Sequence, residues 1–299
     1  MKTIKQRISY AVMGLMAMGF TACTQNEDMA PTLKGQEINA TFSVGGMQTR
    51  VNTLGHGNNW EDKDKLKVSI FTDSDSGSTT VLSFNSTTNE WSRTGSFRWL
   101  DESERHTILA VYPSDMDSWI NNLQYDLQTD QSSEGNLKNA DLITGYWHDV
   151  PRFDLISIPM KHRMSLVTIV YHVGTADYPN MDISEPQVYS KHTSVDFSRD
   201  DRGQFVMSTP TANPAWVKAY KHDDGMFSAI VIPGSYIKDE VFLKFMIGDN
   251  IFNAKMKMPT DFEEGKRYTY KLDVGKDKVE LTRISVDDMT GWTNEEELK

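Results

Sequence analysis

The stretch EINATFSVGGMQTRV, residues 37–51, decides how the whole chain is interpreted. Every second residue of its first half is apolar, which is the period of a β-strand that buries one face. These apolar residues are Ile38, Ala40, Phe42 and Val44. Two glycines follow, and then an isolated arginine at position 50. A regular strand that leads into a flexible joint and a single arginine raises the question of whether the strand stays where it folds.

Alternating or continuous apolar runs recur along most of the chain, separated by turn residues, and they predict many short strands. The expected strands and hairpins lie within residues 65–72, 81–91, 106–115, 155–174, 227–235, 240–259 and 266–286, with an interruption at Pro159. Helical periodicity is weak, and its best candidate is residues 113–127, where many Asn and Asp residues favour an irregular turn instead. The pattern therefore predicts an all-β protein built from β-sandwiches.

The first 22 residues have the character of a lipoprotein signal peptide. A basic start precedes an apolar core, Ile8–Phe20, that is shorter than the ~20 residues of a membrane span. Small residues then stand directly before the only cysteine, so we expect cleavage between Ala22 and Cys23. The Cys23 thiol would carry diacylglycerol, and the new amino terminus an acyl chain such as palmitate. A free reactive thiol is the alternative for this lone cysteine.

The rest of the chain divides into a tether and two domains of ordinary size. Residues 23–36 form the polar tether, and the expected domains are residues 37–155 and 156–299. Loss of the signal peptide removes three positive charges and no negative ones, which leaves 28 Lys+Arg against 42 Asp+Glu and a formal charge of −14. Such an acidic chain does not suit nucleic acid as a partner, because nucleic acid binds basic surfaces.

The sequence lacks the usual motifs for catalysis and metal binding. Its seven histidines are scattered without zinc-site spacing, and His162 and His172 are expected as hydrogen-bonded edge residues. The segment DSDSG at 73–77 begins like a calcium loop, but Phe84 stands where an EF-hand needs glutamate. We therefore expect no cofactor, no metal and no enzymatic activity. The seven tryptophans either fill the space between sheets or, if exposed, stack on the sugars of a glycan.

An ordered series of segments resembles the fimbrillin family of Bacteroidales, in its minor-fimbrillin-like branch. The series runs from the lipoprotein leader through FSVGGMQTR, WEDKDKLKVSIF, ILAVYP, NADLITG, IPMKHRMSLVTIVY, FSAIVIP and FEEGKRYTYKLDV to ISVDDMTGW. Each segment alone is loose, but together they span essentially the whole chain. Two features depart from the family pattern. Gly234 stands where glutamine is frequent, and an acidic tail, TNEEELK, follows the last tryptophan.

The resemblance implies two tandem β-sandwich domains of transthyretin-like topology. It also implies a lipid-anchored, surface-exposed protein of the outer membrane that becomes part of a type V pilus, or fimbrium. In polymerising members of the family, an arginine-specific protease cuts after the first strand and releases the strand together with the lipid. Here that bond would be Arg50–Val51. The vacated groove then accepts a strand from another fimbrial subunit.

Burial of the first strand is worth about 5–9 kcal/mol if all four of its apolar side chains face inward. Its loss would expose backbone groups on the strands at both sides, and such edges bind other strands. The expected donor lies within residues 278–292, where two apolar pairs one residue out of phase indicate a bulge or bend. These pairs are Val279 with Leu281 and Ile284 with Val286. Alternatively, this segment simply closes its own domain.

Other surface roles stay open at this stage. Without cleavage, Cys23 would keep its lipid, and the protein would act as a pilus anchor, a tip subunit or an adhesin. As a binding module it would capture a glycan or a host protein through exposed tryptophans. The expected partners are thus other fimbrial subunits, the outer membrane and one such surface ligand.

Overall fold

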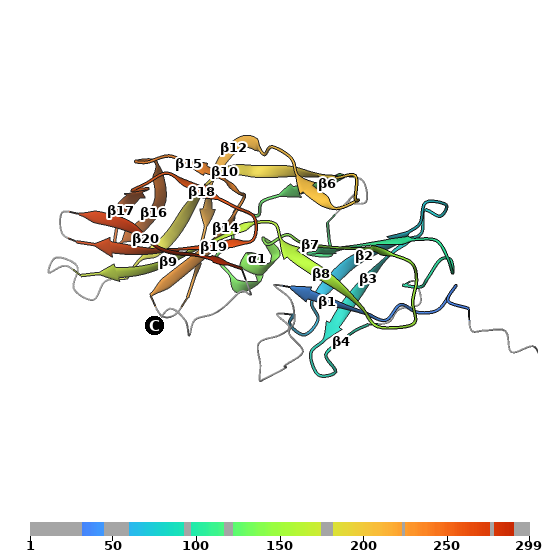
Figure 1. Ribbon diagram of the computed structural model, residues 1–299. Coiled ribbons are helices and arrows are strands. Elements are labelled where there is room, and N and C mark those ends of the chain that lie inside the picture. Colours follow the sequence, from blue (N-terminus) through green and yellow to red (C-terminus); the bar gives the residue numbers. More distant parts are fainter. Residues whose placement is uncertain are drawn as a thin grey trace, which may run out of the picture. The chain divides into compact units, whose positions relative to one another are not determined.

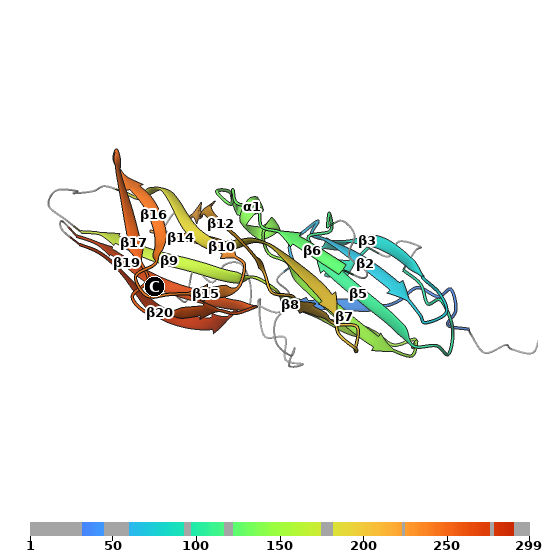
Figure 2. The same cartoon turned by 90° about the horizontal axis from the view of Figure 1, so that it is seen from above.

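The computed structural model describes residues 32–44, 60–92, 97–116, 122–174, 182–222, 225–275 and 278–289 of the chain. Its regular structure is almost entirely β-strand, arranged in three large sheets and one small ladder (Figure 1 and Figure 2). The expectation of an all-β fold is confirmed. Within these ranges, no helix has the length and apolar character needed to cross a membrane.

The first sheet holds seven strands in the order β1-β8-β7-β5-β2-β3-β4. Their bounds are β1 Ala40–Val44, β2 Lys65–Phe71, β3 Ser78–Asn85, β4 Glu90–Trp91, β5 His106–Tyr112, β7 Ile143–Asp149 and β8 Ile156–His162. β1 runs parallel to β8, whereas the other neighbouring strands are antiparallel. The sheet curls around its own core, so that Phe42 on its first strand touches Trp91 on its last.

Two further sheets enclose a second core. One has the order β11-β10-β16-β17, with β12 and β6 also paired to β10, and the other has the order β13-β14-β9-β19-β20. The strands are β6 Asn122–Asp126, β9 Ser165–Val173, β10 Ser184–Arg199, β11 Phe205–Met207, β12 Thr211–Lys218, β13 Tyr220–Lys221, β14 Met226–Val231, β16 Val241–Ile247, β17 Asn250–Lys255, β19 Lys266–Val274 and β20 Val279–Asp288. A small ladder joins β15 Gly234–Tyr236 to β18 Thr260–Phe262.

β5 is buried on both faces and connects the two cores. Ile108, Ala110 and Tyr112 pack in the core of the first sheet, whereas Leu109 and Val111 pack in the second core. A strand in this position needs apolar side chains on both faces, which is why HTILAVY is a continuous apolar run. The two cores are therefore parts of one compact unit, Leu33–Lys299.

β8 belongs to the first sheet, because it pairs with both β1 and β7. β8, which follows residue 155, thus lies in the first sheet, whereas β6, which precedes it, pairs with β10 of the second pair of sheets. The expected interruption at Pro159 is wrong, since this proline lies inside β8. The position tolerates proline because the ladder from β7 reaches only residues 160–162, so the missing N–H leaves no gap in it.

The structure describes the C-terminal part of the helical candidate at residues 113–127, and this part is not a helix. Residues 122–126 form β6, in which buried Leu123 and Tyr125 alternate with exposed polar residues, and β6 pairs with β10. The α-helix of the described ranges is α1, Glu134–Asn139. Ser133 caps α1 by accepting a hydrogen bond from the Asn136 backbone N–H, and Leu137 anchors it in the second core.

Two glycines with left-handed backbone angles allow a steric prediction. Gly77 in the β2–β3 turn has a φ of +68°, and Gly35 has a φ of +78°. A Cβ at Gly77 would lie 1.7 Å from the Ile70 carbonyl oxygen, whereas one at Gly35 would meet nothing within 4 Å. We expect Gly35→Ala to cost about 1–2 kcal/mol through the backbone angle. Gly77→Ala should cost about 1–3 kcal/mol more, because the turn must open.

Urea denaturation of the wild type and the two glycine variants measures this difference. Equal losses of unfolding free energy in Gly35→Ala and Gly77→Ala would contradict the close contact at the turn.

Candidate functional site at the first strand

β1 is attached at its start by a short bridge and along its length by β8. The Ile38 backbone N–H donates to the Phe97 carbonyl at 3.1 Å, just before the strand begins. Farther along, the Ile156 N–H donates to the Asn39 carbonyl at 2.9 Å, and Phe42 lies opposite Ile158 in the parallel register. The chain around Phe97 thus holds the start of this segment, and β8 holds the rest of it.

The expected inward face of β1 is present but is only partly buried. Ile38 and Phe42 are 3% and 1% exposed, whereas Ala40 and Val44 are half-buried. With two large side chains fully buried and two partly so, burial of the segment is worth about 4–7 kcal/mol, somewhat less than the sequence alone suggested.

β1 is an edge strand of the first sheet. Over Ala40–Val44, β8 is its ladder partner, and the described residues provide no second ladder on the other side. The expectation of a neighbouring strand at both sides is therefore wrong for this part of the segment. An edge strand can leave a sheet more easily than an internal one, because only one ladder of hydrogen bonds has to break.

Phe42 lies in a cluster of rings that we call the aromatic clamp, formed by Trp60, Phe84 and Trp91. Trp91 contacts Phe42 edge-on at a centroid distance of 5.4 Å, and Trp60 and Phe84 contact Trp91 at 5.3 and 5.2 Å. The Trp60 Nε1–H donates to the Phe42 carbonyl oxygen at 2.8 Å, in a buried hydrogen bond. The clamp therefore binds both the side chain and the main chain of one residue of β1.

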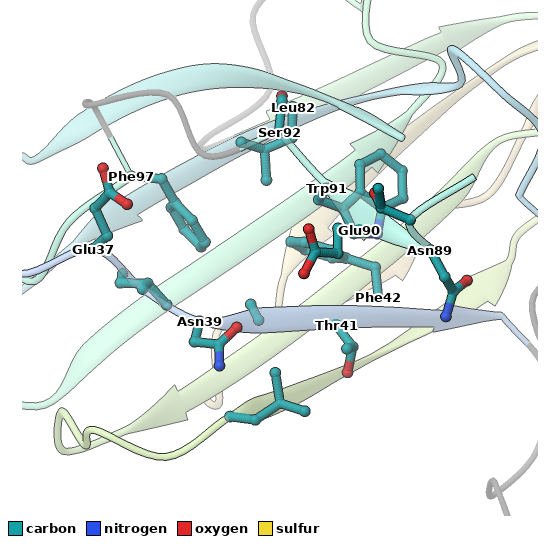
Figure 3. Close-up of a pocket in the computed structure, with 14 residues that line it drawn as sticks. Glu37, Asn39, Thr41, Phe42, Leu82, Asn89, Glu90, Trp91, Ser92 and Phe97 are labelled. Atoms are coloured by element: carbon teal, nitrogen blue, oxygen red, sulfur yellow. The ribbon is translucent and has the colours of Figure 1, made fainter. Parts of the chain in front are cut away.

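A groove of about 330 Å³ lies between β1 and β4, beside the clamp. Figure 3 shows Glu90 and Trp91 facing β1 across the groove, with Phe42 on the same side of the strand and Thr41 on the opposite side. Half of its lining residues are polar, among them Glu37, Asn39, Thr88, Asn89, Glu90 and Ser92. The unpaired edge of β1 therefore borders open space with hydrogen-bonding groups around it.

The described part of the expected donor segment contains β20, an edge strand that pairs antiparallel with β19. The register shifts between the pairs Thr269–Ser285 and Tyr270–Arg283, so Ile284 is the extra residue of a bulge. This bulge matches the phase change seen in the sequence. Leu281 is buried in the second core, whereas Ile284 and Val286 are 57% and 44% exposed.

A surface ion pair fastens the beginning of β20 to the neighbouring segment. The Glu280 carboxylate accepts hydrogen bonds from the Lys257 and Lys278 ammonium groups, and Lys257 also donates to the Thr282 hydroxyl. These bonds, with Lys257 contributing most, lower the pKa of Glu280 to about 2. Later in the strand, Lys266 pairs with Asp288 at 2.6 Å.

The histidines that the structure describes have structural surroundings. His162 is buried, not an edge residue as expected, and its Nδ1 is hydrogen-bonded to the fully buried carboxylate of Asp141. Burial raises the pKa of Asp141, and the interaction with His162 opposes that rise. His106 Nε2 accepts from the Leu100 backbone N–H at 3.0 Å. In the described ranges, no group of three His, Cys, Asp or Glu residues is arranged to hold a metal ion.

The described tryptophans do not form an exposed row. Trp60, Trp91 and Trp99 are buried, and Trp147 and Trp216 are half-buried. They mainly fill the first core and cover its end, which agrees with the first of the two roles considered for them, packing between sheets. Trp119 and Trp292 lie outside the described residues.

Four sequence-predicted site residues also lie outside the described residues: Ala22, Cys23, Arg50 and Val51. Sequence analysis missed the clamp, because only Phe84 and Trp91 belong to one expected hairpin and no spacing connects this hairpin with Trp60. The other signal was the concentration of aromatic residues in the first part of the chain.

The hydrogen bond from Trp60 predicts the effect of a conservative replacement. Trp60→Phe keeps an aromatic ring but leaves the buried Phe42 carbonyl without this donor, which should lower the unfolding free energy by about 1–3 kcal/mol. Urea denaturation measures the change. Trp147→Phe, at a half-buried site that contacts Trp99, is the matched control and should lose less. A larger loss in the control would contradict the assigned role of Trp60.

Glu280 predicts a pH dependence at β20. Its folded-state pKa of about 2 lies below the ordinary value of 4.5, so the carboxylate's contribution to stability is complete above the ordinary value and is lost as the pH falls toward 2. The wild type should therefore lose more stability than Glu280→Gln between about pH 6 and about pH 2. Asp287→Asn, on the same strand, should retain the wild-type loss. The urea midpoints of unfolding at both pH values measure this difference. If the midpoints of Glu280→Gln and the wild type fall equally between the two pH values, the prediction is contradicted.

Comparison with known proteins places these features in a family. A family model described as fimbrillin-like matches residues 49–289. A proposed cell adhesion protein from Bacteroides ovatus has a similar structure, with a TM-score of 0.64 and 14% identity over 85% of this chain and 97% of that one. Another, from Bacteroides uniformis, gives 0.58 and 16% over 77% of this chain and 93% of that one.

At these identities the solved structures establish a likeness of fold alone. Among curated proteins, none is similar enough in sequence to count as a match. The family model, however, covers most of the chain and includes every described strand except β1. The chain therefore belongs to the fimbrillin-like family.

Proposed function

We propose that this chain is a structural subunit of a bacterial surface fimbria, assembled when β1 is exchanged for a strand of a neighbouring subunit. Membership of the fimbrillin-like family supports a fimbrial or adhesive role at the cell surface. That role is structural rather than enzymatic. The finer steps of the proposal are lipidation at Cys23, cleavage after Arg50 and strand exchange at the first sheet.

The position of β1 carries the proposal. This strand is the first of its sheet, it has a ladder on one side over residues 40–44, and a groove borders its other side. Its departure would uncover the edge of β8 and empty the clamp at the same time. An exposed strand edge beside an apolar site binds an extended segment by strand addition.

The limits of the family match support the proposed cleavage point. The matching region begins at residue 49, next to Arg50, so β1 lies outside it. Cleavage of the Arg50–Val51 bond would leave almost the whole family-matching region as the mature subunit. The glycines at positions 45 and 46 would give a protease an extended, accessible backbone before this bond.

The leader accounts for how the precursor reaches the place of assembly. Lipid on Cys23 would hold the chain at the outer membrane, since several acyl chains give lasting attachment. Cleavage after Arg50 would then release the lipid and β1 together. A subunit that escapes cleavage would instead remain as a lipid-bound anchor or adhesin.

β20 supplies a suitable donor. It is an edge strand, so its removal breaks one ladder, and its later part exposes two apolar side chains, Ile284 and Val286, to solvent. The partner that the proposal commits to is a second copy of this chain or a related subunit.

Replacement of Arg50 tests the trigger. Arg50→Ala should leave the precursor uncleaved, so that it keeps its lipid and forms no SDS-resistant ladders in the cells that produce it. N-terminal sequencing of the wild-type protein should read from Val51. Arg202→Ala, an arginine outside the proposed cleavage region, is the matched control and should assemble normally.

Two results would count against the proposal. Unchanged ladders in Arg50→Ala would show that cleavage at this bond is not the trigger. A wild-type protein that retains a blocked, lipid-bearing Cys23 would identify an anchor or adhesin instead of a polymerising subunit.

A further inference from the structure

We propose that the aromatic clamp sets the register of the incoming strand, and that Ile284 of a second copy occupies the place of Phe42. This inference rests on the proposed strand exchange and specifies which residue enters which site. The incoming segment is Thr282–Val286, which lies parallel to β8 of the receiving subunit where Ala40–Val44 lay before.

The clamp is suited to fix a register because it recognises two features of one residue. The Trp60 indole donates to a main-chain carbonyl, a group that every incoming strand provides. The Trp91 ring, by contrast, packs on the side chain at the same position, where a large apolar group fills the space between the rings. In strand addition, main-chain bonds give affinity and side-chain pockets give selectivity.

The C-terminal strand repeats the local sequence of the strand that it would replace. Phe42-Ser43-Val44 corresponds to Ile284-Ser285-Val286, with a large apolar residue, a serine and a valine in the same order. In its own domain this triplet serves no core, since Ile284 and Val286 are 57% and 44% exposed. Thr282 would then take the half-buried place of Ala40.

The bulge divides β20 into a part whose apolar side chain packs in its own core and a part whose apolar side chains are exposed. Leu281, before the bulge, is 2% exposed and packs in the second core of its own chain. Ile284 and Val286, after it, have the opposite phase and cannot reach that core. Residues 282–288 can therefore leave β19 with little loss of apolar burial. Met289, directly after β20, is 3% exposed in the second core and would lose that burial only if it left as well.

Neighbouring registers fit the site less well. With Val286 in the clamp, Asp288 would fall on the half-buried place of Val44, and with Leu281 in the clamp, Arg283 would fall there. With Thr282 in the clamp, a small polar side chain would replace the Phe42 ring. Burial of an unpaired charge or polar group is unfavourable, so the register with Ile284 in the clamp is preferred.

Cysteine cross-linking reads the register directly. Ser157 on β8 is exposed and lies opposite Thr41, so in the proposed register it faces Arg283 of the neighbouring copy. In fibres from cells that express the full-length precursor, the pair Ser157→Cys with Arg283→Cys should give disulfide-linked multimers. The pair Ser157→Cys with Ser285→Cys, which reports the register two residues further on, should give about tenfold less.

Clamp variants test whether the clamp sets that register. Trp60→Phe should lower the yield of SDS-resistant ladders about tenfold, the expected consequence of losing one buried hydrogen bond. Trp147→Phe, outside the clamp, should leave the yield unchanged. Introduced with the cross-linking pair, Trp60→Phe should also reduce the preference for Arg283→Cys over Ser285→Cys.

The outcomes separate this inference from the proposed function. Fibres that cross-link through Ser285→Cys, or through neither pair, would overturn the assigned register and leave strand exchange intact. If Trp60→Phe changes neither the yield of ladders nor the preference for Arg283→Cys over Ser285→Cys, the clamp does not set the register. A wild-type chain that forms no ladders at all would overturn the proposed function, and the inference with it.

Discussion

The attachment of β1 depends on one residue, Phe42, more than on the strand as a whole. Its ring is buried among the clamp residues, and its carbonyl oxygen accepts the Trp60 indole N–H. The other contacts are the ladder with β8 and the burial of Ile38. Because an edge strand has only one ladder, side-chain burial at Phe42 and Ile38 provides much of the free energy that keeps β1 in place. Any process that replaces β1 must therefore refill the Phe42 site.

β5 is held in the first sheet by packing that does not depend on β1. Its two faces belong to two cores, so the loss of β1 removes one wall of the first core and leaves the second core untouched. β1 is also separated from β5 by β8 and β7 in the sheet order. Loss of β1 would consequently leave the other strands of the site in their positions, and such a preorganised site binds an extended partner more tightly.

Local patterns predicted the strands well where one side of a strand faces a core. The alternation at β1 and at β16, and the phase change in β20, all correspond to observed burial and register. The failures have tertiary causes. Pro159 was expected to interrupt a strand, but β7 does not pair with that residue. Residues 122–126 have apolar spacing that suits either a helix or a strand, and pairing with β10 decides for the strand.

The functional site was predictable in part for the same reason. Residues 38–51 predict a strand at the start of the first sheet, whereas the full ring cluster that holds this strand could not be predicted. Phe84 and Trp91 face each other across the β3–β4 hairpin, which the sequence predicts at residues 81–91. Phe42 joins them because the seven-stranded sheet curls until its two edge strands touch, and no local spacing encodes that closure.

Covalent attachment of β1 explains why strand exchange would need a cut. A strand joined to its own domain competes at an effective concentration in the millimolar range for a short flexible connection, so a free neighbour cannot displace it. The neighbour's segment also carries Ile284 where β1 carries a larger phenylalanine, which makes it no better as a ligand for the clamp. In the proposed assembly, cleavage would remove the first advantage, and loss of the lipid-bound fragment would prevent rebinding. The exposed triplet on β20 can then gain burial at Ile284 and Val286 that it lacks in its own chain. In the proposed assembly, the effective concentration of the attached strand would hold β1 in place before the cut, and the gain of apolar burial at Ile284 and Val286 would favour the neighbour's strand after it.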